Sequence, residues 1–221
     1  MGKILIITDN SIRSKALIDV VLNQSSYEVY GVVKVNTDSF ELDVLYKSKV
    51  VGSIKDLPVL LLKNDIIGGV IAISGNILRK EIFKKITLID KKFKFVSVIH
   101  PSSVLGKNVE INKGVIIMPR VVINSDSIIN DFCVLNSCSS LGHDGKLNKF
   151  SSLSEGVIAG GSFSLGELSS IELGVKIIEN IEIGSRTIVK AGSLVLNSFK
   201  NDKIVSGIPA KVICENNYRL F

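Results

Sequence analysis

Two histidines are the natural starting point, because histidine is the side chain that most readily takes up and returns a proton near neutral pH. They are His100 and His143. His143 is followed by Asp144, and a neighbouring carboxylate favours one imidazole tautomer and stabilises the charged ring as it forms. His100 precedes Pro101, and we interpret it as a structural or substrate-facing residue. The pair His143–Asp144 is therefore the candidate proton-transfer group; the alternative is a surface histidine without a role.

Metal and disulfide chemistry find little support in the sequence. The three cysteines, Cys133, Cys138 and Cys214, form no CxxC pair, so we expect neither a zinc site nor a disulfide framework. The two histidines share no acidic motif, which indicates that the protein holds no metal.

Composition indicates a globular protein. Hydrophobic residues make up 46% of the 221 residues and charged residues 22%, which excludes a disordered chain. The longest apolar runs, such as residues 58–62, fall short of the ~20 residues that a membrane-spanning helix needs. The N-terminus resembles the start of a strand and not a signal peptide. We therefore expect a cytoplasmic enzyme or binding protein with no membrane span.

Positive charge is concentrated in the first half of the chain. Residues 1–96 hold 15 Lys or Arg and 10 Asp or Glu, net +5, whereas residues 97–221 hold 12 and 11, net +1. A basic half can attract an anionic ligand such as a nucleotide. We interpret the lysine pairs at 84–85 and 91–92 as solvated helix and loop ends. No helix-turn-helix, zinc finger or aromatic-basic pattern occurs, so no nucleic-acid partner is expected.

An internal repeat dominates the second half. Every sixth residue from 99 to 195 is aliphatic, which gives 17 consecutive positions without an insertion. These positions are Ile99, Leu105, Ile111, Ile117, Ile123, Ile129, Leu135, Leu141, Leu147, Leu153, Ala159, Leu165, Ile171, Ile177, Ile183, Val189 and Val195. A period of six fits neither an α-helix nor an alternating strand.

A parallel β-helix explains this period, because three short strands and three corners make one coil of 18 residues. The aliphatic side chains then stack inside, coil over coil, and Cys133 falls at an inward position as a small core residue. His143 lies two residues after Leu141, which predicts an outward corner, and Gly161 falls beside it one coil later. The residue after each aliphatic position is often Gly or Asn, and we predict positive φ there. Examples are Gly106, Asn112, Asn124, Asn130, Asn136, Gly142, Asn148, Gly160, Gly166 and Gly184.

The first half alternates apolar runs with helical stretches. We predict strands at residues 3–7, 28–35, 58–62 and 69–74, and helices near 11–23 and 76–90. This order indicates a small parallel α/β unit, Rossmann-like, with three or four strands. Residues 91–95 are the expected linker, which divides the chain into domains 1–96 and 97–221.

The combination resembles the hexapeptide-repeat sugar acetyltransferases, of the nucleotide-sugar N-acetyltransferase and sialic acid O-acetyltransferase type that includes the bacillosamine and perosamine enzymes. Residues 206–211, SGIPAK, are similar to the family's C-terminal G-x-P-A-K signature, and residues 71–79, IAISGNILR, to its I-A-I-G-x-N-x-x-R motif. The resemblance implies a left-handed β-helix, acetyl-CoA as co-substrate and a homotrimer. It also implies that the N-terminal domain binds the nucleotide-sugar acceptor.

The resemblance assigns candidate roles to individual residues. It implies that His143 is the catalytic base, oriented by Asp144, and that Gly161 lies in the acyl-CoA site. A glycine stacked beside the histidine also leaves room for the thioester and exposes an N–H as an oxyanion donor. The other expected acyl-CoA contacts are Ser152 (where the family has a second His), Ala191, Gly192 and Gly207. The expected acceptor contacts are Asn136, Ser74 and Gly75, together with Asn10, Ser11 and Asn36, which stand where the family has its glycine-rich loop and an acidic pair.

The function that follows is transfer of an acetyl group from acetyl-CoA to the amine of a nucleotide-linked amino sugar, in bacterial surface glycan or protein glycosylation pathways. One alternative is O-acetylation of a sialic-acid-like sugar, because the same base serves a hydroxyl. Another is a binding or scaffold protein that keeps the fold without turnover. Loop 8–13, which lacks the family's glycines, and Ser152 motivate that alternative, whereas His143, Asp144 and Gly161 favour an enzyme.

Overall fold

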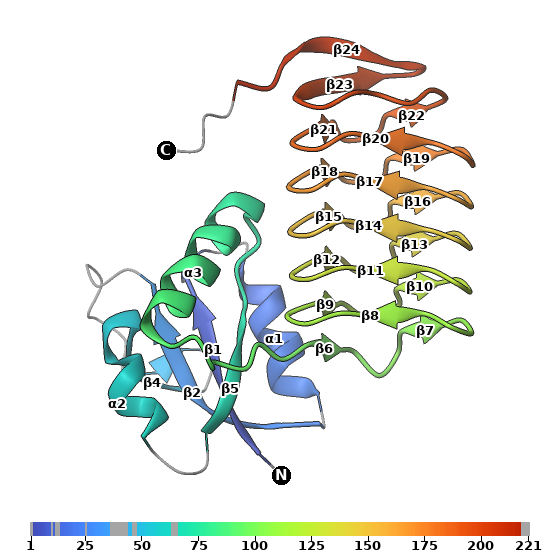
Figure 1. The fold of residues 1–221 in the computed structure, drawn as a ribbon. Coiled ribbons are helices and arrows are strands. Elements are labelled where there is room, and N and C mark those ends of the chain that lie inside the picture. Colours follow the sequence, from blue (N-terminus) through green and yellow to red (C-terminus); the bar gives the residue numbers. More distant parts are fainter. Residues whose placement is uncertain are drawn as a thin grey trace. The chain divides into compact units, whose positions relative to one another are not determined.

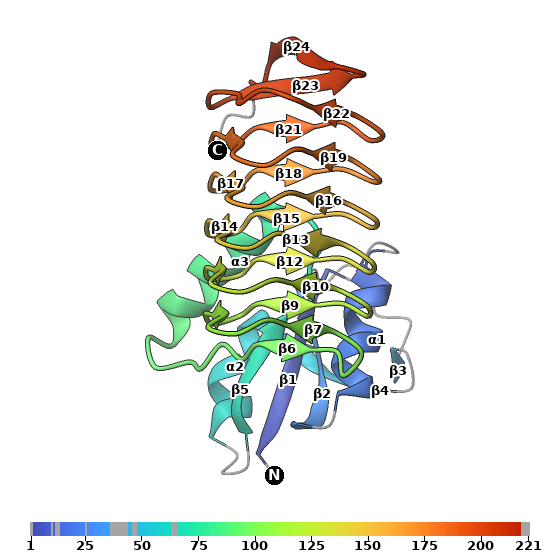
Figure 2. The ribbon, with the colours of Figure 1, turned by 90° about the vertical axis from the view of Figure 1, so that its right-hand side faces the viewer.

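The computed structural model describes residues 2–9, 11, 14–24, 26–35, 44–45, 48–62 and 66–217, with residues 44 and 45 described by their backbone only. The chain divides into two compact units, Met1–Val98 and Ile99–Phe221. Figures 1 and 2 show that helices and a sheet make up the first unit, whereas stacked short strands make up the second.

The first unit is built on a mostly parallel sheet. Its strand order is β3-β4-β2-β1-β5, in which β1 pairs in parallel with β2 and β5, and β2 with β4, whereas β3 and β4 are antiparallel. The strands are β1 (Lys3–Thr8), β2 (Glu28–Lys34), β3 (Val44–Leu45), β4 (Ser48–Ser53) and β5 (Ile66–Ile71). Residues 4–7 of β1 are fully buried, as expected for a central parallel strand covered on both faces.

Three α-helices accompany this sheet in the described part of the chain. They are α1 (Lys15–Asn23), α2 (Leu57–Leu61) and α3 (Asn76–Ile89), and a 3-10 turn, Ile54–Asp56, precedes α2. Within the described residues, none of the helices is long and apolar enough to cross a membrane.

The strand predicted at residues 58–62 is wrong, because this segment forms α2. A capping box between Ser53 and Asp56 starts a helical turn, and Pro58 stands in the first turn of α2, where its missing N–H costs nothing. Leu57 and Leu60, three residues apart, are buried, whereas Val59 is exposed. This spacing is helical, and in a run composed almost entirely of apolar residues the sequence does not reveal it.

Two further strand predictions differ from the structure. The last strand of the sheet begins at Ile66 and not at residue 69. Strand β4, Ser48–Ser53, was not predicted because its sequence SKVVGS has only two strongly apolar residues. With β3 and β4 the sheet has five strands among the described residues, against the three or four expected.

The second unit is a parallel β-helix with three faces. The first face contains β6 (Val98–Ile99), β9 (Ile116–Ile117), β12 (Val134–Leu135), β15 (Ser152–Leu153), β18 (Ser170–Ile171) and β21 (Ile188–Val189). The second face contains β7 (Val104–Leu105), β10 (Val122–Ile123), β13 (Ser140–Leu141), β16 (Ile158–Ala159), β19 (Lys176–Ile177) and β22 (Leu194–Val195). The third face contains β8 (Glu110–Ile111), β11 (Ile128–Ile129), β14 (Lys146–Leu147), β17 (Ser164–Leu165) and β20 (Glu182–Ile183).

Each coil adds 18 residues, as predicted: Leu141 pairs with Ile123 of the preceding coil and Ala159 of the next. The aliphatic positions from Ile117 to Val195 are at most 5% exposed, so they form the interior of the β-helix. The stacked parallel strands are consistent with the left-handed β-helix that the family resemblance implies. We call the turn between the first and second faces corner 1, that between the second and third faces corner 2, and that between the third and first faces corner 3.

The prediction of positive φ directly after each aliphatic residue is wrong. Positive φ occurs two residues later, as at Asn108, Asp126 and Asp144. Glycine is needed at the earlier position because coils approach closely there: a Cβ on Gly142 would lie 2.4 Å from the carbonyl carbon of Gly160. Asparagine suits the same position because its side chain bonds to the next coil, as when Asn148 Nδ2 donates to the Leu165 carbonyl over 2.9 Å.

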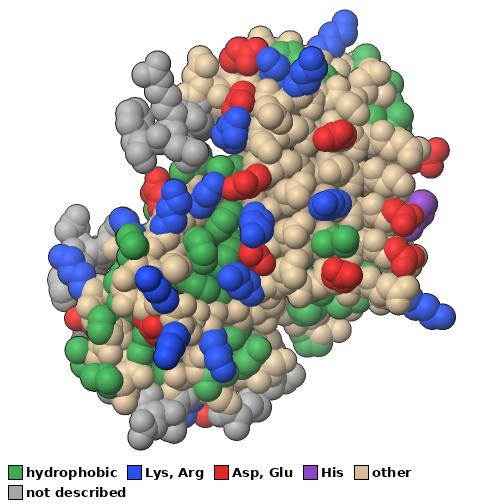
Figure 3. Space-filling model, in the orientation of Figure 1, with side chains coloured by type: hydrophobic (Ala, Val, Ile, Leu, Met, Phe, Trp, Pro, Cys, Tyr) green, Lys and Arg blue, Asp and Glu red, His purple; other side chains and the backbone are tan. Residues whose placement is uncertain are grey.

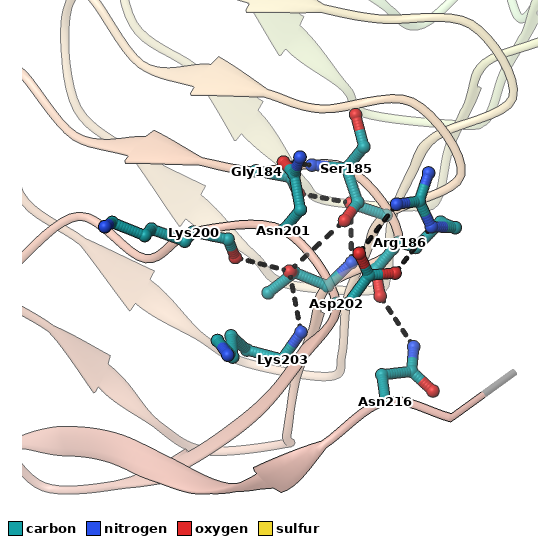
Figure 4. A network of polar contacts seen from close by, with 10 residues as sticks. Gly184, Ser185, Arg186, Lys200, Asn201, Asp202, Lys203 and Asn216 are labelled. Carbon is teal, nitrogen blue, oxygen red and sulfur yellow. Dashed lines mark hydrogen bonds and ion pairs between the residues drawn. The ribbon is translucent and has the colours of Figure 1, made fainter.

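A hairpin closes the C-terminal end of the β-helix. Strands β23 (Lys203–Gly207) and β24 (Ala210–Glu215) are antiparallel, and β23 continues the first face beside β21. Figure 4 shows the polar network at this end, in which the Arg186 guanidinium donates two hydrogen bonds to Asp202, at 2.5 and 2.6 Å. Asn216 Nδ2 donates to the Arg186 carbonyl over 2.6 Å, so the segment after β24 is tied to the last complete coil.

Candidate active site

His143 lies at corner 2, between β13 and β14, where the chain reads Gly142, His143, Asp144, Gly145. The His143 Nδ1 and an Asp144 carboxylate oxygen are 2.6 Å apart. Both side chains are open to solvent, 62% and 60% exposed. With the proton placed on Nδ1, the ring donates to Asp144 and the lone pair of Nε2 is left to accept a proton.

The next coil presents Gly161 beside this ring. A Cβ on Gly161 would lie 2.5 Å from His143 Nε2 and 2.7 Å from Cε1, so any larger residue would displace the imidazole. The Gly161 N–H has no hydrogen-bond partner among the residues that the structure describes. An unpaired backbone N–H is the kind of donor that stabilises a tetrahedral oxyanion.

The backbone of corner 2 is held in place by neighbouring coils. Asp144 N–H donates to the Ser125 carbonyl of the preceding coil over 3.0 Å, and Ser162 N–H donates to the His143 carbonyl over 2.7 Å. Asn180 N–H donates to the Gly161 carbonyl over 2.9 Å. The histidine therefore stands on a rigid framework although its side chain is exposed.

Four of the other residues predicted for the acyl-CoA and acceptor sites lie away from corner 2 within one chain. Asn136, Ala191 and Gly192 are at corner 1, and Gly207 ends β23 and donates its N–H to Ser193 Oγ of corner 1 over 3.2 Å. Asn136 Nδ2 donates to the Leu153 carbonyl over 3.0 Å as part of the asparagine ladder. The second face separates this group from His143.

Ser152 is also apart from His143. It begins β15 on the first face and is only 8% exposed. A single chain therefore brings together His143, Asp144 and Gly161, and it does not bring Ser152 or the corner 1 residues to them.

Three candidate acceptor residues lie at one edge of the sheet in the first unit. Ser11 follows β1, and Ser74 and Gly75 follow β5, the parallel neighbour of β1, so all three lie beyond the carboxyl ends of adjacent strands. This is where ligands of open α/β sheets bind. Asn10 and Asn36 lie outside the described residues.

Buried Arg79 fixes the turn that carries Ser74 and Gly75. Its guanidinium, inaccessible to solvent, donates to the carbonyls of Ile73 and Ser74, at 2.9 and 3.1 Å, and to Asn76 Oδ1 at 2.7 Å. Arg79 was recognised in the sequence only as part of a motif, without a role, because burial of an arginine is not visible in a sequence.

Asp9 was missed by the sequence analysis. Its carboxylate accepts hydrogen bonds from the Ser11 N–H, at 3.1 Å, and from the Ser14 hydroxyl, at 2.7 Å. The signal was available, since an Asp followed two residues later by Ser favours this kind of turn. The carboxylate thus links Ser11, after β1, to Ser14, before α1.

His100 has a local structural role. Its Nδ1 accepts a hydrogen bond from the Ser102 N–H over 3.1 Å and lies 2.8 Å from Ser102 Oγ. Ser102 Oγ in turn accepts from the Arg120 N–H of the next coil. Cys133 is fully buried, in accord with its predicted inward position, and no group of three metal-ligating side chains occurs within the described part of the chain.

Comparisons with known proteins point in one direction. No family model matches the chain. Over 122 residues it is 33% identical to a serine acetyltransferase of Buchnera aphidicola, a match that covers 53% of this chain and 38% of that protein. The chain thus spans well under half the length of this relative.

Solved structures match over almost the whole chain. A variant of perosamine N-acetyltransferase from Caulobacter crescentus, in complex with CoA and GDP-perosamine, has a TM-score of 0.85 at 28% identity and covers 96% of this chain and 97% of that one. The acetyltransferase domain of PglB from Neisseria gonorrhoeae (TM-score 0.84, 21% identity) and WeeI from Acinetobacter baumannii (0.78, 20%) each cover 96% of this chain and 100% of their own. These last two show the same fold.

Proposed function

We propose that this chain is a hexapeptide-repeat sugar acetyltransferase that transfers the acetyl group of acetyl-CoA to the amine of a nucleotide-linked amino sugar, in a bacterial surface-glycan or protein-glycosylation pathway. The observation that carries the proposal is corner 2, where His143, Asp144 and the free Gly161 N–H lie together. The likeness to a Caulobacter crescentus enzyme solved with CoA and GDP-perosamine supports the choice of donor and acceptor. We place the reaction in the cytoplasm, where acetyl-CoA is available.

The geometry suggests how the residues act. As the acceptor nitrogen attacks the thioester carbonyl, a C–N bond forms and the carbonyl electron pair moves onto oxygen, where the Gly161 N–H donates to it. His143 Nε2 takes the proton that the nitrogen loses, and Asp144 stabilises the resulting imidazolium. When the oxyanion collapses, the C–S bond breaks and the imidazolium returns its proton to the departing CoA sulfur. No covalent enzyme intermediate is needed.

A homotrimer completes the site. The second face carries outward apolar side chains, including Val104 at 59% and Ile158 at 52% exposure, which a neighbouring copy would cover. This face is bounded by corner 1 on one side and corner 2 on the other. In a three-fold ring with the second faces inward, corner 1 of one subunit adjoins corner 2 of the next. Asn136 of one subunit would then face His143 of another, and Ala191 and Gly192 would lie three coils further along the same corner.

The first unit is proposed as the acceptor-binding domain, with a Rossmann-like role. Strand β1 has β2 on one side and β5 on the other, so the chain reverses its winding direction there. Such a switch point opens a crevice at the carboxyl ends of the strands. Ser11, Ser74 and Gly75 line this edge.

Two other functions remain distinguishable by experiment. O-acetylation of a sialic-acid-like sugar would use the same His143 base on a hydroxyl. A binding protein without turnover would not depend on His143 at all.

The test is thiol release from acetyl-CoA across UDP-, GDP-, dTDP- and CMP-linked amino and hydroxy sugars, with His143→Ala alongside. Release that requires an amino sugar and falls at least ~10²-fold in the variant supports the proposal. Release only with hydroxy sugars would replace it with O-acetylation. Binding of an acceptor without any release would favour the non-catalytic protein.

A further inference from the structure

The C-terminal end of α3 and the loop that follows carry a dense group of lysines. Residues 80–94 contain six Lys and two acidic residues, net +4. Lys84, Lys85, Lys91 and Lys92 are all exposed. The sequence analysis interpreted these pairs as solvated ends, and the proposed acetyl transfer makes no use of them.

Apolar side chains project from the middle of this group. Leu88, in the last turn of α3, is 84% exposed, and Ile89 is 39% exposed. Leu88 lies one helical turn after Lys84, and Ile89 one turn after Lys85, so each apolar side chain has a lysine beside it on the helix. We call this surface, Lys84, Lys85, Leu88, Ile89, Lys91 and Lys92, the α3 tip.

The α3 tip is held rigidly from beneath. Ile82 and Ile86 on the opposite side of α3 are fully buried, and they fix which face of the helix points outward. Phe93 is buried and packs on Phe95 with ring centroids 4.9 Å apart. The Asp90 carboxylate accepts a hydrogen bond from the Lys92 N–H over 2.8 Å, so the lysine-bearing loop is folded back against the end of the helix.

The surroundings share this mixed character. In the same unit, Val59 of α2 is 66% exposed and Leu62, directly after α2, is 79% exposed. Figure 3 shows hydrophobic and Lys or Arg side chains interspersed over α2 and α3, with few acidic side chains among them. A solvated helix end explains the exposed lysines. It does not explain the exposure of Leu62 and Leu88 to water, which costs free energy.

We propose that the α3 tip docks on the surface of an anionic lipid bilayer, with its lysines among the headgroups and Leu88 inserted at the acyl boundary. Charge complementarity selects an anionic partner. A nucleic acid would pair with the lysines but give Leu88 nothing apolar to contact. A bilayer can bind both the lysines and Leu88. The Lys side chains extend to the anionic headgroups, and an exposed apolar residue in the last turn of the helix reaches the boundary between headgroups and acyl chains. The inference is independent of the proposed acetyl transfer.

The absence of tryptophan from the chain makes a direct test possible. Leu88→Trp introduces a single fluorophore at the tip, and Lys200→Trp, at an exposed position of the β-helix, is the matched control. Both full-length variants are titrated with vesicles of phosphatidylcholine containing 30 mol% phosphatidylglycerol, roughly the range in which surface charge attracts basic segments. For Leu88→Trp we expect a blue-shifted emission and quenching by brominated lipids; for Lys200→Trp we expect neither.

Vesicle sedimentation of the unlabelled protein provides the second measurement. Wild type should bind anionic vesicles and not pure phosphatidylcholine, and Lys91→Gln with Lys92→Gln should weaken binding by roughly fivefold per lysine. Leu88→Gln should weaken it about tenfold without altering thiol release or the melting temperature, since the side chain is exposed. The pair Lys49→Gln and Lys200→Gln removes the same charge elsewhere and should have little effect.

Three results would overturn the proposal. Failure of wild type to bind anionic vesicles at low salt would exclude a membrane surface. Binding that Leu88→Gln leaves unchanged would mean general adsorption of a basic protein. Binding of an acidic polypeptide or of DNA with the same dependence on Leu88, and no vesicle binding, would assign the tip to a macromolecular partner.

Discussion

The imidazole of His143 lies so close over Gly161 that a Cβ at that glycine would fall 2.5 Å from Nε2. Gly161 does not have positive φ, so its conformation does not call for glycine. The absence of a side chain on Gly161 is what lets the ring occupy its position beside the next coil. In the proposed mechanism the two residues work as a unit: His143 supplies the base, and Gly161 supplies both space and an oxyanion donor.

Gly161→Ala should accordingly inactivate the enzyme without unfolding it. The added methyl group must push the imidazole away from the donor N–H, and we expect kcat to fall about 10²-fold, the usual contribution of a positioned base. Thiol release measures the rate, and the melting temperature should change little because the displaced side chain is exposed.

A double-mutant cycle checks that the effect passes through the histidine. If Gly161→Ala acts by displacing the ring, it should cost little further activity when added to His143→Ala. Full additivity of the two losses would mean that the glycine acts separately, for instance through contact with the pantetheine.

Asp144→Asn tests the second partner of the histidine. Asp144 has a φ of 56°, which asparagine tolerates well, so this substitution leaves the turn intact. The amide oxygen can accept a hydrogen bond from the His143 Nδ1–H, but the amide carries no charge to stabilise the imidazolium. We expect kcat to fall roughly tenfold. This loss is smaller than for a buried triad, because solvent screens an exposed pair. Asp144→Ala also adds backbone strain and should therefore reduce stability as well. Equal rates of thiol release by wild type and Asp144→Asn would exclude Asp144 from the mechanism.

Much of the β-helix follows from the sequence alone. The interior is set by a strict six-residue spacing, so Leu141, Ile123 and Ala159 could be placed in one ladder and His143 over Gly161 by adding one coil. The spacing does not predict the backbone conformation of the corners. Gly142 and Asp144 both suit positive φ by residue type, and only the close approach of the next backbone shows that Asp144 is the residue that adopts it.

The α/β unit was less predictable because residues 58–62 are a short, wholly apolar run and β4 has few apolar residues. Residues 57–62 can form a buried strand or one and a half turns of helix, and the Ser53–Asp56 cap and contacts with the sheet determine which of the two forms.

The candidate site could be predicted only in part, for a different reason. Asn136 was predicted as an acceptor contact and Gly192 as an acyl-CoA contact, and the second face separates their corner from His143 within one chain. A sequence does not say which contacts are made between copies.

Mixing two inactive variants tests whether sites are shared between subunits. His143→Ala lacks the proposed base and Asn136→Ala lacks the proposed acceptor contact, so in the proposed homotrimer each variant alone should be impaired at all of its sites. After unfolding and refolding together, mixed trimers should regain activity, because some interfaces then pair an intact His143 with an intact Asn136. If one variant carries an affinity tag that co-purifies the untagged one, the trimers are mixed, and no recovery in them would place both residues in the same subunit's site. Ile158→Glu, on the second face, should prevent assembly.

The close approach of coils at corner 3 gives a prediction about stability. A Cβ on Gly166 would lie 2.3 Å from the Ser185 nitrogen, and backbone cannot move aside as a side chain can. Gly166→Ala should therefore cost about 1–3 kcal/mol of unfolding free energy. Asn148→Ala, one coil earlier at the same corner, removes only a ladder hydrogen bond and should cost about 1 kcal/mol. Denaturant titration measures both, and equal stability of Gly166→Ala and wild type would contradict the coil packing.

The ion pair at the C-terminal cap should make stability depend on pH in a defined direction. Hydrogen bonds from the Arg186 guanidinium lower the pKa of Asp202 below its ordinary value, so the unfolded chain binds a proton at this carboxyl more readily than the folded one. The pair therefore stabilises the cap at pH values above the ordinary carboxyl pKa of about 3.9, and this stabilisation is lost as the pH falls toward the lower pKa of the folded state.

Both side chains are 39% exposed, so we expect Asp202→Asn to cost only about 1 kcal/mol at pH 7. Asn tolerates the φ of 59° at this position, which leaves the backbone unstrained.

The melting temperatures of wild type and Asp202→Asn should differ most at neutral pH and converge below about pH 4. Asp131→Asn, which removes a longer pair with Lys149 at 3.3 Å, is the control and should shift the melting temperature less. A difference between wild type and Asp202→Asn that stays constant down to pH 3, in roughly the range where a free carboxyl is mostly protonated, would mean that the cap is held by Asn216 and the hairpin strands, and not by this charge.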